Sequence, residues 1–319
     1  MNNGSKVGAF AAGLAVTFAA SFGIGHAVGP VGSQSATAHA EHGDATGTKG
    51  DTGSTATEGS QQAADTRPGG LEVSERGYTL VPSAEPMTTG AARDFRFRIT
   101  GPDGKAVTRY SLSHEKALHL IVARRDLSGF QHVHPQLSPD GSWNVPLAFD
   151  AAGTYRVFAD FVPAGGTGLT LGADVSVAGD YRPAALPAAA RTTTVDGYTV
   201  TLSGDLTPRK ASMLTLSVTR DSRPVTDLQP YLGAYGHLVA LRQGDMGYLH
   251  VHPEGAPGDG TTPAGPGISF HAVAPSAGTY RLYLDFQHGG TVHTAEFTVV
   301  AGTPSTTAPS APEHGGHEH

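Results

Sequence analysis

Two short stretches with the same histidine pattern stand out in this chain. Residues 129–135 read GFQHVHP and residues 247–253 read GYLHVHP. Side chains alternate along a β-strand, so the two histidines of a His-x-His pair lie on the same face. Each pair therefore either fastens a duplicated fold or offers two imidazoles to a metal ion.

A third histidine precedes the first pair. His119 lies in the apolar run LHLIVA, and a hairpin that turns at Asp126–Leu127 places it opposite His134. Residues that oppose each other in a hairpin share a face. Three imidazoles, the third from His132, would then gather at the open end of one hairpin, which fits the ligand count of a histidine-rich zinc or copper site.

The second copy predicts the same arrangement. A turn at Gly244–Asp245 places His237 opposite His252. His288 follows in a stretch where the first copy has Pro163, so the second copy offers an additional ligand. The candidate metal ligands are His119, His132, His134, His237, His250, His252 and His288.

A purely structural interpretation remains open for all of these histidines. A lone imidazole within an apolar strand commonly bonds a neighbouring carbonyl. His132 and His250 lie deepest in their hairpins and are the most expected to be structural. Asp160 and Asp285 could orient a ligand histidine, although a bond to nearby backbone or to an arginine is the stronger expectation.

The composition narrows the chemistry. The 319 residues include 16 histidines and no cysteine, which excludes disulfides, zinc–thiolate sites and cysteine-ligated blue copper. With 4 methionines, a bound metal would depend on imidazole and carboxylate, which favours Cu(II), Zn(II) or Ni(II) over Cu(I). The formal net charge is −7, so a nucleic acid is not an expected partner.

The chain contains an internal duplication. The segments RGYTLVPS and AGTYRVFADF are matched later by DGYTVTLS and AGTYRLYLDF. Short apolar runs between glycine, proline and aspartate residues predict an all-β fold. Tyr155 and Tyr280 occupy the position of the tyrosine corner in immunoglobulin-like domains. We therefore expect two tandem Ig-like or cupredoxin-like β-sandwich domains.

The remaining segments complete the predicted organisation. An apolar run, VGAFAAGLAVTFAASFGIG, predicts a signal peptide or membrane-anchor helix and an extracytoplasmic location, secreted or at the plasma membrane. The polar segment after it is typical of a disordered tether. The expected boundaries are 1–30 for the signal or anchor, 31–69 for the linker, 70–179 for the first sandwich, 180–191 for a second linker, 192–301 for the second sandwich and 302–319 for a disordered histidine-rich tail.

The motifs GHLVALR, YLHVHP and AGTYRLYLDFQHGG resemble a group of secreted or membrane-anchored actinobacterial proteins with such duplicated domains. That resemblance implies a β-sandwich outside the cytoplasm and an association with heavy-metal handling, copper above all. The leading hypothesis is a non-enzymatic protein that binds or buffers a divalent transition metal through its hairpin histidines.

Two alternatives stay open. In the first, the sandwiches are a structural or protein-interaction module, its partner another cell-envelope protein, and the histidines only fasten strands. In the second, the protein is a metal-dependent hydrolase with Asp160 or Asp285 as base. The hydrolase needs an open coordination position and a substrate cleft, and no motif in the sequence indicates a cleft.

Overall fold

A computed structural model describes residues 68–249 and 251–302. These residues contain strands, turns and loops but no helix, so the prediction of an all-β chain is confirmed for them. No described helix could cross a membrane. The predicted signal or anchor helix, most of the 31–69 linker, His250 and nearly all of the C-terminal tail lie outside the described residues.

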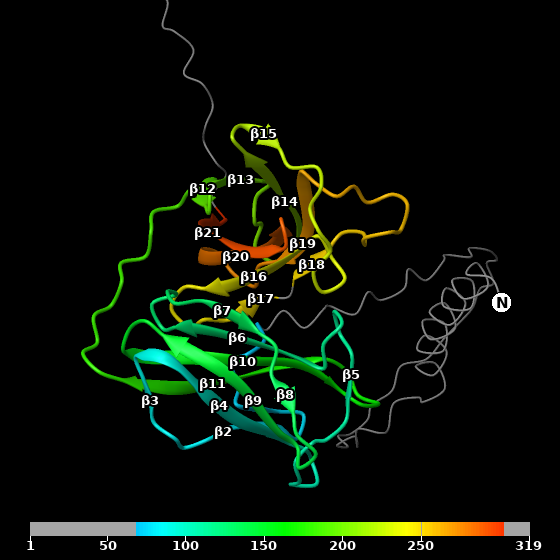
Figure 1. The fold of residues 1–319 in the computed structure, drawn as a ribbon. Helices are drawn as coiled ribbons and strands as arrows, with labels where there is room; N and C mark the ends of the chain where they lie inside the picture. Colours follow the sequence, from blue (N-terminus) through cyan, green and yellow to red (C-terminus); the bar gives the residue numbers. More distant parts are fainter. Residues whose placement is uncertain (1–67, 250, 303–319) are drawn as a thin grey trace, which may run out of the picture. The chain divides into compact units, whose positions relative to one another are not determined.

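Each repeat folds into two facing β-sheets (Figure 1). In the first repeat one sheet has the strand order β1-β2-β4-β9-β8, and the other has the order β3-β11-β10-β6-β7 with β5 paired to β10. The strands are β1 (Ser74–Glu75), β2 (Tyr78–Pro82), β3 (Met87–Thr88), β4 (Gly90–Thr100), β5 (Tyr110–Ser111), β6 (Leu118–Arg124), β7 (Gln131–Val133), β8 (Gln136–Leu137), β9 (Ser142–Phe149), β10 (Gly153–Pro163) and β11 (Leu169–Ala178).

The second repeat reproduces this topology. Its sheets have the orders β12-β13-β14-β19-β18, with β15 paired to β14, and β17-β16-β20-β21. The strands are β12 (Thr192–Val195), β13 (Tyr198–Ser203), β14 (Ala211–Arg220), β15 (Arg223–Pro224), β16 (Gly236–Arg242), β17 (Tyr248–Leu249), β18 (Val251–Pro253), β19 (Gly267–Val273), β20 (Gly278–His288) and β21 (Thr291–Ala301).

A tyrosine corner closes each sandwich, as the sequence predicts. The Tyr155 hydroxyl donates to the carbonyl of Ala151 at 2.8 Å, and the Tyr280 hydroxyl donates to the carbonyl of Ser276 at 2.8 Å. Both rings are buried. Because each phenol finds a carbonyl four residues upstream, the bend before β10 or β20 is fixed without a disulfide.

The strand that carries His119 is buried on both faces. Along β6 every residue is buried. Leu118, Leu120 and Val122 enter the core between the two sheets of the first repeat. The alternate residues Ile121 and Ala123 belong instead to a second apolar cluster that includes residues of the second repeat. His119 shares this outer face, because side chains two apart point the same way.

Candidate functional site

The β6–β7 hairpin brings three histidines together. Its register pairs Ile121 with His132, which confirms the predicted alignment. The Nδ1 atom of His119 lies 3.1 Å from Nε2 of His132 and 3.2 Å from Nε2 of His134. One nitrogen from each ring lies within 4.8 Å of the others, a grouping able to hold a metal ion. His132, which the sequence marks as structural, is thus part of this triad.

Hydrogen bonds identify one donating nitrogen in each of two triad rings, His119 and His132. His119 Nε2 lies 3.0 Å from the carbonyl of Ser113 and must donate, because a carbonyl only accepts. His132 Nδ1 lies 2.7 Å from a carboxylate oxygen of Asp285 and donates there. In the neutral rings, His119 Nδ1 and His132 Nε2 are therefore both lone-pair atoms that face each other. A cation between them would turn this repulsive approach into two favourable contacts.

The nitrogen spacing suits a metal ion. Zinc–nitrogen bonds are about 2.0–2.1 Å long, so two nitrogens on one ion lie about 2.9–3.4 Å apart at bond angles from square to tetrahedral. The distances of 3.1 Å and 3.2 Å from His119 to its neighbours fall within this range. His119 Nδ1 accordingly has a ligand's spacing toward both neighbours, and all three nitrogens lie within 4.8 Å of one another.

Burial favours the neutral form of two rings of the triad, His119 and His134. The pKa of His119 is lowered to about 3, first by desolvation and then by the neighbouring histidines, against a raising contribution from the Ser113 carbonyl. The pKa of His134 is also lowered to about 3, by desolvation and by His132 and His119. Both rings thus offer lone pairs well below the pH of about 6.5 at which a free histidine takes up a proton.

Asp285 bonds a histidine of the triad, which is the weaker of the two expectations from the sequence. It faces His237 across β16 and β20, yet its Oδ2 bonds His132 of the first repeat at 2.7 Å and its Oδ1 accepts from Thr294 at 2.6 Å. The stronger expectation, a bond from this carboxylate to backbone or to an arginine, is wrong: its bonds are to His132 and Thr294. No sequence pattern could reveal the pairing, because 153 residues separate the two partners.

In the described part of the second repeat, His252 pairs with a different strand from its counterpart His134. β17 ends at Leu249, and Val251–Pro253 pairs with β19 in the other sheet, where His252 lies opposite His271. The expected hairpin pairing of His252 with His237 is therefore not formed. His237 is buried like His119 and donates from Nε2 to the carbonyl of Tyr231 at 2.9 Å. His250 lies outside the described residues.

His288 lies in a different group of side chains. Its Nδ1 is 2.7 Å from the Tyr198 hydroxyl and its Nε2 is 3.1 Å from Asp227. Nearby, His293 bonds Asp196 through Nδ1 at 2.7 Å. This group holds β13 against β20 and β21, and none of its bonds connects His288 to His119, His132 or His134.

A small cavity adjoins the triad. It measures about 60 Å³ and is lined by residues of both repeats, among them His119, His132 and His237. His114 also lines it, with its ring centre 6.1 Å from that of His119 and 5.3 Å from that of His237. His114 is exposed to solvent, and its backbone has a left-handed conformation (φ 46°).

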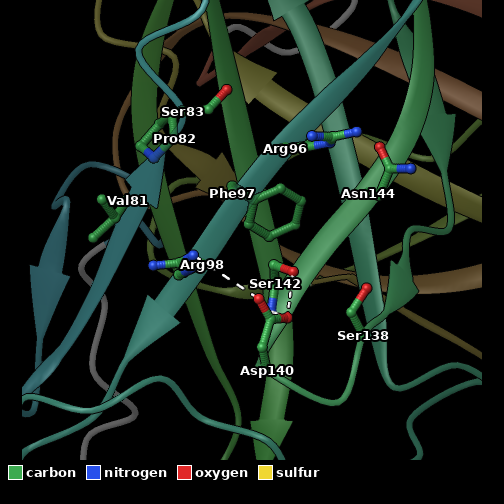
Figure 2. Close-up of a pocket in the computed structure, with 10 residues that line it drawn as sticks. All are labelled: Val81, Pro82, Ser83, Arg96, Phe97, Arg98, Ser138, Asp140, Ser142 and Asn144. Atoms are coloured by element: carbon green, nitrogen blue, oxygen red, sulfur yellow. Dashed lines mark hydrogen bonds and ion pairs between the residues drawn. The ribbon is translucent and has the colours of Figure 1, made fainter.

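A wider groove lies on the other sheet of the first repeat (Figure 2). Its volume is about 500 Å³, and it is lined by strands β2, β4 and β9 without any histidine. Arg98 and Asp140 approach within 3.9 Å there, and both side chains are largely exposed. The groove is thus separate from the histidine triad in both sheet and chemistry.

These features define a tandem β-sandwich protein with a partly buried triad of histidines. The chain belongs to the family described as a domain of unknown function, DUF8832, whose model matches residues 72–179 and 193–303. The two matches cover both repeats, each including its histidine hairpin. No curated protein matches the chain.

Several solved structures share a general likeness. A putative membrane anchored protein from Corynebacterium diphtheriae is 12% identical, with a TM-score of 0.22, over 70% of this chain and 57% of that one. The bacterial integrin-binding protein invasin is 13% identical, with a TM-score of 0.21, over 70% of this chain and 38% of that one. The chain therefore spans less than two thirds of either protein.

Proposed function

We propose that the protein is a non-enzymatic, extracytoplasmic binder or buffer of a divalent transition metal. The metal would be held by His119, His132 and His134, with copper as the leading cargo and zinc as the alternative. The apolar N-terminal run supports the location. The absence of cysteine confines the ligands to imidazole and carboxylate, which suits Cu(II) and Zn(II).

The convergence of unprotonated nitrogens carries this proposal. His119 Nδ1 and His132 Nε2 approach within 3.1 Å although their other nitrogens are committed to donating. A histidine that only fastened a strand would need a single bond from its N–H group. It would not need a second ring nitrogen close to its lone pair. A bound cation gives both lone pairs a favourable partner.

The size of the cavity supports binding over catalysis. Sites for small organic molecules usually measure about 300–1,000 Å³, whereas the cavity beside the triad measures about 60 Å³. Since a water molecule needs about 10–15 Å³, this space suits an ion with a few waters. It is too small for the substrate cleft that a hydrolase of ordinary substrates requires.

Titration of the full chain tests the proposal. We expect the wild type to bind one equivalent of Cu(II) or Zn(II) more tightly than the variant with His119→Gln and His134→Gln, measured by competition against a chromophoric chelator. The histidine-rich tail is present in both chains, so its weak binding cancels. Equal affinities in the two chains would refute metal binding at the triad.

A structural role is the second candidate function, and one observation favours it. His119 and His237 make the same bond, each from Nε2 to a carbonyl six residues upstream, at 3.0 Å and 2.9 Å. That shared bond fastens the preceding loop in both repeats. If fastening were the whole role, substitution of His134 would lower the melting temperature equally with and without metal.

A further inference from the structure

We propose that the metal site belongs to both repeats, with Asp285 of the second repeat as the positioning residue for ligand His132 of the first. Metal loading would then stabilise the docking of the two repeats on each other. This inference rests on the proposed function. It adds that the second repeat, which contributes no ligand to the triad, controls the metal affinity of the site. The metal in turn stabilises the second repeat.

An apolar interface already joins the repeats. All described residues fall within one compact unit. Ile121, Ala123, Leu127 and Phe158 of the first repeat form one buried cluster with residues of the second. Those partners are Val239, Leu241, Met246 and Tyr283. The interface thus uses the outer faces of the sheets that contain His119 and His237.

The interface is reciprocal, because equivalent residues meet across it. Phe130 stacks on Tyr283 with ring centres 3.9 Å apart, and Phe158 packs on Tyr248 at 5.7 Å. Phe130 and Tyr248 occupy equivalent positions in the two repeats, as do Phe158 and Tyr283. Such an arrangement is an isologous contact within one chain, and it fixes where each sheet's histidines and aspartates lie relative to the other.

Polar bonds then set the alignment of this interface. The Tyr283 hydroxyl donates to the carbonyl of Leu127 at 2.6 Å, and both groups are buried. Gly69 and Tyr248 exchange two backbone hydrogen bonds of 3.0 Å. Gly69 falls in the predicted linker, but here it is paired. The Tyr283 bond holds β20, which contains Asp285, against the turn of the β6–β7 hairpin, and the Gly69 bonds join the start of the first repeat to β17.

Asp285 completes the triad chemically. Its carboxylate oxygen accepts from His132 Nδ1 at 2.7 Å, and the two side chains are 5% and 6% exposed. The bond orients the ring and leaves Nε2 as the lone-pair atom that faces His119. A carboxylate behind a ligand histidine raises the basicity of the ligand, and its loss typically costs about 10–100-fold in metal affinity.

Binding and docking are then linked in both directions. A metal that binds the triad better when Asp285 is in place must favour the docked arrangement by the same factor. The second repeat therefore gains stability from an ion that it does not itself ligate. A site built by the first repeat alone would show no such effect.

The test compares Asp285→Ala with Asp196→Ala in the full chain. Asp196 accepts from His293 Nδ1 at 2.7 Å in the same repeat, so its variant removes the same kind of bond outside the triad. We expect the Zn(II) dissociation constant to rise about 10–100-fold in Asp285→Ala and to stay within about twofold of the wild type in Asp196→Ala. Asp285→Asn, which keeps an acceptor oxygen, should recover part of the loss.

Hydrogen–deuterium exchange provides a second readout that mere destabilisation would not give. Zn(II) should slow exchange in β16 and β20 of the wild type and of Asp196→Ala, and should slow it much less in Asp285→Ala. Equal Zn(II) affinities in the two alanine variants, or metal protection confined to the first repeat, would overturn the inference while metal binding stands. Failure of the wild type to exceed the His119→Gln, His134→Gln chain would instead refute the proposed function.

Discussion

The two hairpins begin from nearly the same sequence and end in different places. In the first repeat, β7 stays paired with β6 through Val133, and the next strand joins the other sheet only at Gln136. In the second repeat the chain has already joined the other sheet at Val251. This shift takes His252 away from His237, whereas His134 remains beside His119. The same motif therefore places its last histidine differently in the two repeats.

The comparison also separates scaffold from chemistry. Both repeats keep the tyrosine corner and the histidine-to-carbonyl bond from β6 or β16. Among the described residues, only the first repeat assembles three converging ring nitrogens. The corner and the histidine bond are thus common to both repeats, whereas the strand after the hairpin joins the other sheet at different positions.

The largest effect that we expect is the loss of stability in acid, and both repeats should contribute. Folding lowers the pKa of His119 to about 3 and that of His237 to about 4, chiefly by desolvation. The unfolded chain therefore binds more protons below pH about 6.5, and the free energy of unfolding of the metal-free protein falls as the pH drops through this window, by up to about 1.4 kcal/mol per pH unit for each histidine. Urea denaturation from pH 7 to pH 4 measures it.

Single substitutions measure how much His119 and His237 each contribute to this loss of stability in acid. His237→Gln should reduce the pH dependence of the unfolding free energy down to about pH 4. His119→Gln should reduce it down to about pH 3. Trp143, the only tryptophan of the chain, reports unfolding of the first repeat. A pH dependence unchanged in both variants would contradict the burial of neutral rings.

The next effect distinguishes the two hairpins directly. His134→Gln removes one of three proposed ligands and should weaken Zn(II) or Cu(II) binding by more than about 100-fold, since even the loss of an outer partner costs about 10–100-fold. His252→Gln changes the equivalent residue, which is exposed and paired with β19, and should leave the affinity within about threefold. Isothermal titration of both variants provides the comparison. Equal losses would mean that the second hairpin also contributes to a site.

The smallest effect should be the same in both repeats. Tyr155→Phe and Tyr280→Phe each remove a hydroxyl that donates to a carbonyl at 2.8 Å. A net hydrogen bond contributes about 0.5–1.5 kcal/mol, so we expect a loss of about 1 kcal/mol in each variant and unchanged metal affinity. Thermal denaturation with and without Zn(II) measures both. A change in affinity in either variant would show that the corner also supports the site.

Much of the scaffold could be predicted because its signals are local. The recurring short apolar runs predicted the all-β fold, and the glycine-containing bends predicted the corners at Tyr155 and Tyr280. The turn at Asp126–Leu127 fixed the register that brings His119 and His134 together, since pairing across a hairpin follows from counting. These predictions needed only neighbouring residues and the alternation of side chains along a strand.

The interface between the repeats could not be predicted in the same way, although one signal was present. LHLIVAR is apolar at nearly every position, which is typical of a strand covered on both faces. The outer positions Ile121 and Ala123 are indeed buried against the second repeat. The pattern indicates that both faces of the strand are buried, but not which segment packs against the outer face.

By itself, the sequence determined the duplication, the absence of thiol ligands and the one face shared by His119, His132 and His134. Only the tertiary structure decided that Asp285 lies behind His132 and that His252 leaves its hairpin. The reason is physical: a strand's periodicity fixes which way each side chain points. What it then meets depends on packing between segments more than 100 residues apart, here 153 for His132 and Asp285.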